Sequence, residues 1–268
     1  KEDIIPSSAD KPLFILAPFM IFIGAFISFI AIPFGDSIII ADLNIGLFYI
    51  LGVGSIAVLS LILAGWASNN KWSLYGGMRS AAQIVSYEIP AGLSLIVVIM
   101  LAGTLNMQDI IAYQAGGMFN WIIFDNPFVP ITFVVYFISA IAETNRTPFD
   151  LPESESELVA GFATEYSGMR YAFFFLSEYA NMFVVSAVAA AGFLGGWHSP
   201  IAGFMDSSAW GVFWMVSKTF FLIFVMIWLR WTLPRLRVDQ LMNVCWKVFL
   251  PLALINIFGV AIWTVIFN

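Results

Sequence analysis

Long apolar runs separated by short polar segments dominate the sequence. Seven runs are near the roughly 20 residues that a helix needs to cross about 30 Å of hydrocarbon; they cover residues 13–32, 43–65, 81–103, 127–142, 169–194, 210–229 and 248–267. The run at 127–142 is short, so we expect Asn126 or Glu143 at a membrane boundary or the helix buried among its neighbours. The pattern predicts an all-α integral membrane protein of about seven transmembrane helices, forming a single polytopic domain over residues 1–268.

The composition agrees with a membrane protein. Hydrophobic residues make up 61% of the chain and charged residues 10%, whereas soluble domains contain about 45–50% and about 25% respectively. The single cysteine, Cys245, excludes an internal disulfide and a cysteine-based zinc or iron–sulfur site, because each needs several thiolates. Any redox metal is therefore expected in another chain.

The cationic residues give a prediction of topology. Ten of the eleven lie in loops that share one side if the chain crosses seven times: Lys1, Lys11, Lys71, Arg79, Arg146, Arg170, Arg230, Arg235, Arg237 and Lys247. The alternate loops, near 33–42, 104–126 and 195–209, contain neither Lys nor Arg. Because cations collect in short loops on the cytoplasmic side, the cationic loops, including a basic loop at 230–247, are expected to face the cytoplasm or the mitochondrial matrix.

Three ionisable residues fall inside predicted spans. Glu88 lies in the third, Glu178 in the fifth and Lys218 in the sixth. A charge near the bilayer centre costs roughly 2.5–3.5 kcal/mol on insertion scales, so such groups usually face the bundle interior, pair or titrate. Two interpretations stay open: a proton path assisted by the adjacent Tyr87 and Tyr179, or a buried ion pair of Lys218 with either acid that only holds helices together.

The segment between the fourth and fifth runs, the loop at 143–168, is acidic. Its carboxylates are Glu143, Asp150, Glu153, Glu155, Glu157 and Glu165, against Arg146 within the loop and Arg170 just after it. Pro148 and Pro152 break a regular helix there. Apolar residues interleave with the acids: Phe149, Leu151, Leu158, Val159 and Phe162. This interleaving indicates a segment packed against protein, and it favours a soluble partner at this face over a loop that is simply solvated.

These motifs together resemble a known family. The stretch ETNRTPFDLPESESELVAGFATEYSGMRYAFFFLSEYANM is similar to the signature of NuoH, a membrane subunit of bacterial respiratory complex I, and of its mitochondrial counterpart. The similarity continues in the expected order through KEDIIPSSADKPLF, AGWASNN, RSAAQIVSYEIP, GGWHSP and LRWTLPRLRVDQLMNVCWKVFLPLAL, which covers nearly the whole chain. The family has a further transmembrane helix and an amphipathic helix before KEDIIP. An eighth, N-terminal span is therefore expected outside this sequence.

The resemblance implies a membrane subunit of a proton-pumping NADH:quinone oxidoreductase, in a bacterial cytoplasmic (inner) membrane rather than a mitochondrial one. In that family the subunit joins the membrane arm to the hydrophilic arm and forms much of a quinone chamber, with quinone as substrate. NADH oxidation, the flavin and the iron–sulfur clusters belong to the hydrophilic arm. This chain is thus expected to bind no flavin, cluster or metal, to contain no complete redox centre or catalytic residue, and to contact other complex I subunits and lipid but no nucleic acid.

The resemblance also implies site residues. The chamber wall and the arm interface are expected at Glu143, Arg146, Asp150, Glu153, Glu155, Glu157, Glu165 and Tyr166. Glu88 and Glu178 match buried acids that are thought to begin a polar axis towards the pumping subunits. Reduction of a quinone to a quinol consumes two protons, and nearby carboxylates sense the change of charge through a low-dielectric interior. We hypothesise a coupled file of acids whose pKa values are set by Lys218: Glu165, Glu143, Glu88 and Glu178.

Arg235 and Arg237 form a positive patch between the last two runs. Lipid headgroups and the docked hydrophilic arm would lie at this patch. A plain topology anchor is the alternative.

Two other functions stay open. The chain could be the membrane anchor of a related hydrogenase or of a ferredoxin- or deazaflavin-linked dehydrogenase, although ETNRTPFDLPE and SEYANM together favour the NADH enzyme. It could also be an ion-coupled secondary transporter whose buried Glu and Lys bind an ion. A transporter should be stable alone, whereas a complex I subunit should co-migrate with flavin and iron–sulfur proteins.

Overall fold

The computed structural model describes residues 3–36, 38–150, 160–201, 203, 205 and 207–267. Within these ranges the chain is helical and contains no regular β-strand. Six of the described helices are long and apolar enough to span a membrane, and the apolar helix α6 (Val129–Glu143) is shorter. The prediction of an all-α membrane protein with about seven crossings is confirmed.

The six long spans agree with the predicted runs. They are α1 (Lys11–Ser28) continued by η1 (Phe29–Ala31), α2 (Gly46–Ala67), α3 (Lys71–Ala102), α8 (Gly168–Phe193), α9 (Ser208–Thr232), and a C-terminal span made of α10 (Val238–Val244), the π-helical turn η4 (Cys245–Phe249) and α11 (Leu250–Phe267). Two spans differ clearly, because α3 begins at Lys71 rather than at the predicted residue 81, and the C-terminal span begins at Val238 rather than at 248, inside the predicted basic loop. The side chain of Asn70 accepts a hydrogen bond from the Trp72 N–H at 3.0 Å and caps an extra stretch too polar for hydropathy to detect.

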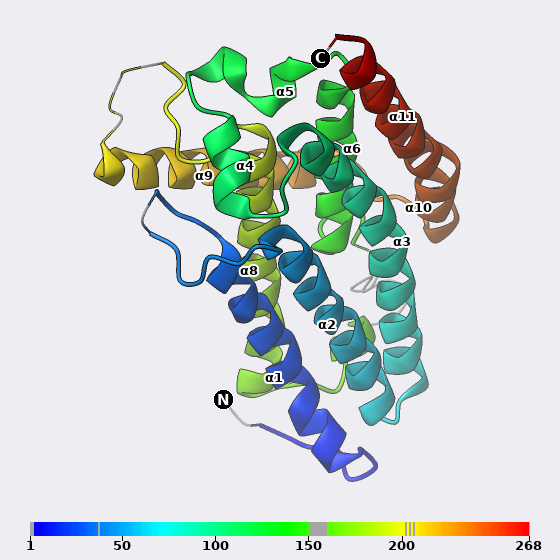
Figure 1. Cartoon of the computed structure of the whole chain (residues 1–268). Coiled ribbons are helices and arrows are strands. Elements are labelled where there is room, and N and C mark those ends of the chain that lie inside the picture. Colours follow the sequence, from blue (N-terminus) through cyan, green and yellow to red (C-terminus); the bar gives the residue numbers. More distant parts are fainter. Residues whose placement is uncertain are drawn as a thin grey trace.

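Several short helices were not predicted. They are α4 (Met107–Tyr113), η2 (Met118–Asn120), α5 (Ile122–Asp125) and η3 (Gly161–Ala163). The first three follow α3, between the third and fourth predicted runs. They cover the end of the bundle at which α3 ends and α6 begins (Figure 1).

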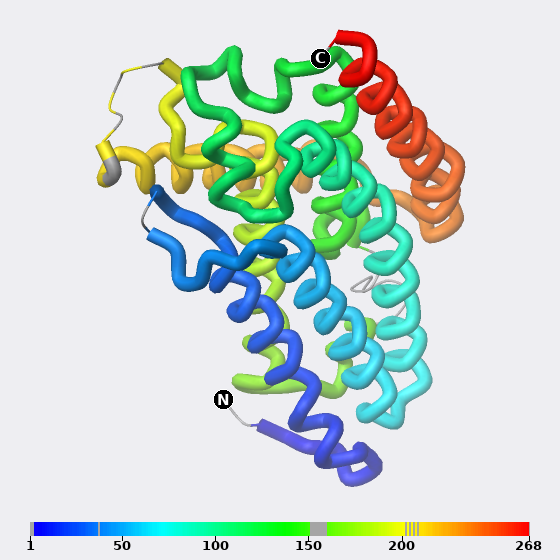
Figure 2. The backbone as a smooth tube through the Cα atoms, viewed as in Figure 1, coloured from blue at the N-terminus to red at the C-terminus, as the bar shows by residue number. Residues whose placement is uncertain are grey.

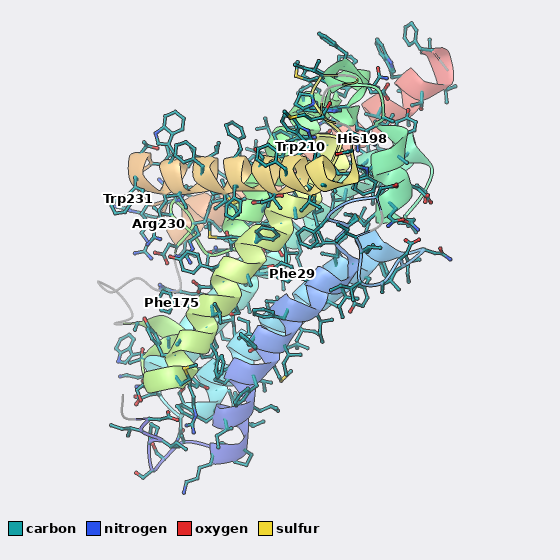
Figure 3. All side chains as sticks on the ribbon, turned by 90° about the vertical axis from the view of Figure 1, so that its left-hand side faces the viewer. Phe29, Phe175, His198, Trp210, Arg230 and Trp231 are labelled. Atoms are coloured by element: carbon teal, nitrogen blue, oxygen red, sulfur yellow. The ribbon has the colours of Figure 1, made fainter. Side chains whose placement is uncertain are left out.

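The long helices form a tilted bundle crossed by one helix. In Figure 1, α1 packs against α2 and α8, and α3 packs against α2, α6 and α11. Helix α9 runs across α8 rather than alongside it, in Figure 1 and again in the view from the side in Figure 3. The first turn of α1 and the last turn of α11 lie at opposite ends of the molecule (Figure 2).

Helix α6 is short and lies buried among other helices. Its neighbours are α3, α5, α8 and α11, and residues such as Val129, Val135 and Ala142 are almost fully enclosed. Asn126 accepts a hydrogen bond from the Phe128 N–H at 3.0 Å at one end of α6, and Glu143 is the last residue at the other end. The burial among neighbouring helices that was expected as one possibility for this short run is therefore confirmed.

Hydrogen bonds gather the loops into two groups. In the first, which holds the cationic loops, Asn69 donates to the Ser8 carbonyl, Asn70 to Glu165, and the Leu236 N–H to the Pro148 carbonyl. In the second, Asn106 donates to Asp42 and the Met118 N–H to the Pro200 carbonyl. The alternation of cationic and cation-free loops is thus also an alternation in space.

Gly76 provides a test of how the acidic loop packs on α3. A Cβ at this position would lie 2.6 Å from the Gly161 backbone, so Gly76→Ala must push η3 away from the helix. Overpacking of this kind typically costs about 1–3 kcal/mol. We expect a lower thermal unfolding midpoint for the purified membrane protein. Gly92→Ala on the same helix is the matched control, because a Cβ there meets nothing within 4 Å; equal midpoints for the two variants would contradict this packing.

Candidate functional site

A buried ion pair joins the acidic loop to helix α8. The Arg146 Nη2 lies 3.3 Å from the Glu178 Oε2, and the two side chains are only 6% and 9% exposed. The guanidinium also stacks on the ring of Tyr179, with its central carbon 4.4 Å from the ring centroid. A loop residue therefore neutralises an acid inside the bundle, which matters because an unpaired buried charge is costly.

Glu143 lies next to this pair. Its carboxylate is hydrogen-bonded to the side chain of Asn181, one turn beyond Glu178 on α8. It also lies over Gly54 of α2, where an added Cβ would be 3.7 Å from the Glu143 Oε1. The glycine therefore leaves room for the carboxylate between α2, α6 and α8.

Two small cavities place three acids in series. One, of about 30 Å³, is lined by Glu178, Asn181 and Glu143, and the other, of about 20 Å³, is lined by Asn181, Glu143 and Glu88. Each exceeds the roughly 10–15 Å³ that one water molecule requires. Glu88, on α3, accepts a hydrogen bond from the Ser55 hydroxyl of α2 at 3.1 Å. We call Glu178, Glu143 and Glu88, with Asn181 between them, the acid file.

The acid file can pass a change of charge from one acid to the next. Carboxyl groups separated by space for one water can exchange protons through it, and charges interact strongly where the surroundings are apolar. Glu88 is partly exposed at the contact between α2 and α3. The file thus runs from the pair that Arg146 of the loop forms with Glu178 of α8 to the partly exposed Glu88.

A groove between α8 and α9 begins at the same arginine. It has a volume of about 210 Å³ and is lined by Arg146, Tyr179, Met182, Met226, Ile227, Arg230 and Trp231. In Figure 3, α9 diverges from α8 towards the end that carries Arg230 and Trp231. The Arg146 Nε has no hydrogen-bond acceptor among the residues that the structure describes. The groove therefore offers an apolar wall and a cationic donor that is coupled to the acid file through Glu178.

Glu165 and Tyr166 lie elsewhere, and the expected membership of Glu165 in the file is corrected. Glu165 accepts a hydrogen bond from Asn70 at 2.7 Å, and it lines neither cavity of the file. Tyr166 stacks on Phe14 with ring centroids 4.0 Å apart, and burial raises its pKa well above the ordinary value although the nearby Arg170 opposes this shift. The two residues fasten the end of the loop to α1 and to the α2–α3 turn.

Lys218 also differs from expectation. Its Nζ donates to the carbonyls of Leu194, Gly196 and His198 at 2.6, 2.9 and 2.7 Å, and lies 4.3 Å from the centroid of the Trp121 ring. These carbonyls follow the C-terminal end of α8, where a cation is favoured. Lys218 was expected to pair with Glu88 or Glu178, or to set the pKa values of the acids. Instead, it caps the C-terminal end of α8, beside the group of loops that contains no other Lys or Arg.

The acidic loop is held by its own chain. The Gln83 side-chain amide of α3 donates to the Ala142 carbonyl, the Asn145 side chain and the Phe149 carbonyl. Phe149 packs on Tyr87, and Phe162 packs on Phe174. These two apolar residues of the loop are therefore buried against this chain itself; Leu151, Leu158 and Val159 lie outside the described residues.

The remaining predicted loop residues divide into two sets. Asp150 lies 3.9 Å from Arg235, so the acidic and basic loops meet. Glu153, Glu155 and Glu157, like Leu151, Leu158 and Val159, lie outside the described residues. No group of three or more His, Cys, Asp or Glu that could hold a metal ion occurs in the described ranges.

Sequence reasoning missed several residues of the site. Asn181 follows Glu178 by three positions and so shares its helix face, a spacing that could have identified it. Ser55 and Gly54 carry no comparable signal. Tyr87 and Tyr179, which were expected to assist a proton path, make other contacts. The Tyr87 hydroxyl donates to the Leu241 carbonyl at 2.9 Å, and the Tyr179 ring lies under Arg146. Tyr136, which lines the smaller cavity, was not predicted.

Comparison with known proteins identifies the family. The sequence model described as NADH dehydrogenase matches residues 1–261. Three curated relatives are each named as the H subunit of an NADH-quinone oxidoreductase. The one from Chlorobaculum tepidum is 55% identical over an alignment of 275 positions, which covers 99% of this chain and 77% of the relative. Those from a Geobacillus species and Anaeromyxobacter dehalogenans are 51% and 47% identical, covering 98% and 99% of this chain and 76% and 68% of each relative.

Arg146→Gln tests the buried ion pair. Removing one partner of such a pair leaves the other charge uncompensated and costs roughly 3–5 kcal/mol. The thermal unfolding midpoint of the purified membrane protein should fall, and the double variant Arg146→Gln with Glu178→Gln should recover part of the loss. Arg235→Gln is the control: its pair with Asp150 is longer and more exposed, and such pairs contribute about 0–1 kcal/mol. Equal losses for Arg146→Gln and Arg235→Gln would speak against the pair.

Lys218→Met tests the cap on α8. The variant keeps the apolar stem but removes three charge-assisted hydrogen bonds, so stability should fall by about 2 kcal/mol or more. The measurement is again the unfolding midpoint. Lys247→Met removes an exposed cation from the C-terminal span and should leave the midpoint nearly unchanged. A midpoint unaffected by Lys218→Met would show that the three carbonyls do not depend on this lysine.

Proposed function

Since the chain belongs to the NADH dehydrogenase family and resembles H subunits of NADH-quinone oxidoreductase over almost its whole length, we propose that it forms the quinone chamber of such an enzyme and couples quinone reduction to proton translocation. One observation carries the proposal. Arg146 both lines the α8–α9 groove and pairs with Glu178, the first acid of the file. A single side chain thereby connects a binding groove with a row of proton-carrying groups.

The groove suits a quinone. Its methionine, isoleucine and aromatic side chains match an apolar ring and tail, while Arg146 and Arg230 can donate hydrogen bonds to quinone oxygens. Such donors bind more strongly as negative charge develops on those oxygens. The chain would thus bind and orient the quinone, and the electrons would come from the hydrophilic arm.

Coupling would follow from the position of Arg146. Reduction of a quinone to a quinol consumes two electrons and two protons, so charge changes next to the guanidinium during turnover. Any shift of Arg146 towards the quinone weakens its contact with Glu178. Glu143 and Glu88 sense that change, because charges in an apolar interior interact over several ångströms. The partly exposed Glu88 is then the point at which a neighbouring membrane subunit receives the signal.

The cationic loops would face the cytoplasm of a bacterial cell. The acidic loop at 143–168, including Glu153, Glu155, Glu157 and Glu165, and the basic loop at 230–247 would form the surface on which the hydrophilic arm docks. That arm would carry the flavin and the iron–sulfur clusters. The hydrogen bond from the Leu236 N–H to the Pro148 carbonyl supports a common surface, because it ties the two loops together.

The proposed coupling is tested by Glu88→Gln and Glu143→Gln in the intact enzyme. Each variant removes a proton-carrying group from the file, so coupled NADH:quinone reductase activity and proton uptake into vesicles should fall by about tenfold or more. Oxidation of NADH by a water-soluble artificial acceptor should stay unchanged, because it does not require the membrane arm.

Asp109→Asn is the control for charge alone. This carboxylate is exposed, bonds to Thr104 and belongs to the other loop group. Its loss should leave both activities at the wild-type level. Full coupled activity in both glutamate variants would overturn the proposal, and so would an equal loss in Asp109→Asn.

A further inference from the structure

Helix α3 contains a proline beside the last acid of the file. Pro90 lies two residues after Glu88, inside the helix. Proline has no N–H, so the carbonyl of Ser86, four residues earlier, loses its normal helical donor, and the proline ring crowds that carbonyl. Ser86 is buried. In an apolar membrane such a carbonyl needs a donor from a neighbouring element.

That donor comes from the C-terminal span. The Cys245 Sγ lies 3.0 Å from the Ser86 carbonyl oxygen, and this cysteine is 1% exposed. One turn before Cys245 on the C-terminal span, a second hydrogen bond has its donor on α3: the Tyr87 hydroxyl donates to the Leu241 carbonyl at 2.9 Å. Two side-chain hydrogen bonds, one from each helix, therefore link the turn of α3 that precedes Pro90 to α10 and η4.

A second irregularity lies at the same contact. The C-terminal span changes from α-helical to π-helical at Cys245, and η4 packs against α3. In Figure 1, α10 lies alongside the middle of α3. Single π-helical turns are uncommon and occur frequently at functional sites. Here the turn begins at the residue whose thiol reaches the orphaned carbonyl.

We propose that Cys245 is a positioning residue whose S–H replaces the N–H that Pro90 lacks and fixes the turn of α3 that carries Glu88. With the turn fixed, Glu88 meets Ser55 and the cavity that it shares with Glu143. The positioning role rests on the proposed function of Glu88 in proton coupling. Packing alone is the competing explanation, since a buried thiol is also a small apolar side chain.

Substitutions of Cys245 in the intact enzyme separate the two explanations. Cys245→Ala removes the donor, and Cys245→Ser keeps a donor on a side chain of similar size. We expect Cys245→Ala to lower the kcat of coupled quinone reduction by about threefold to tenfold, the range for one lost hydrogen bond. KM for quinone should stay unchanged, because Cys245 does not line the α8–α9 groove. Cys245→Ser should restore most of the rate; a serine variant as slow as the alanine variant would overturn the proposal.

Pro90→Ala provides the second-site test. Alanine returns the missing N–H to α3, so the thiol is no longer needed, and Cys245→Ala should cause no further loss in the Pro90→Ala background. An equal loss in both backgrounds would reject a role through the Ser86 carbonyl. If Pro90→Ala prevents assembly of the enzyme, the comparison of serine and alanine at Cys245 still decides the question.

An infrared measurement tests the bond independently of activity. The difference spectrum between the wild-type enzyme and Cys245→Ala isolates the S–H stretch of this one thiol. We expect the band at the lower frequency of a hydrogen-bonded thiol; a band at the free-thiol frequency would refute the inference. Failure of the Glu88 experiment with a shifted S–H band would reject the proposed function while leaving the hydrogen bond established.

Discussion

The ion pair between Arg146 and Glu178 is the contact on which the other features of the site depend. A carboxylate that is 9% exposed inside a helical bundle requires a cation, and the cation is supplied by a loop that must fold back onto α8 to reach it. The three bonds from Gln83 hold that loop in place. One of these bonds is to the Ala142 carbonyl, so Gln83 also holds the end of α6, where Glu143 lies.

This constraint explains why the site combines charge with small residues and small cavities. Three acids can lie in series only if the helices between them leave space, and Gly54 of α2 provides it opposite Glu143. Each cavity holds little more than a water molecule. Such narrow spacing keeps the surroundings of the three acids apolar, and charges in apolar surroundings are screened less than charges in bulk solvent.

The sequence predicted the features that depend on local pattern. Apolar length gave the spans, the positions of Lys and Arg gave the two groups of loops, and the cost of burying charge identified Glu88 and Glu178. Partners set by tertiary geometry could not be read in this way. Lys218 is as deep in a predicted span as the acids are, but α9 runs across the bundle and brings it to the end of α8. Glu165 is a carboxylate of the same acidic loop that contains Glu143. The fold of the loop nevertheless places it beside Asn70, from which it accepts a hydrogen bond.

The irregularities of the helices occur where the acids are. Pro90 follows Glu88 on α3, the π-helical turn η4 faces the same stretch, and the short helix α6 ends at Glu143. In an apolar environment each interrupted backbone group needs a donor or acceptor from a neighbour. The side-chain bond of Cys245 meets this need, because its thiol reaches the Ser86 carbonyl that Pro90 leaves without a helical donor. The Tyr87 hydroxyl adds a second link between the same two helices at the Leu241 carbonyl.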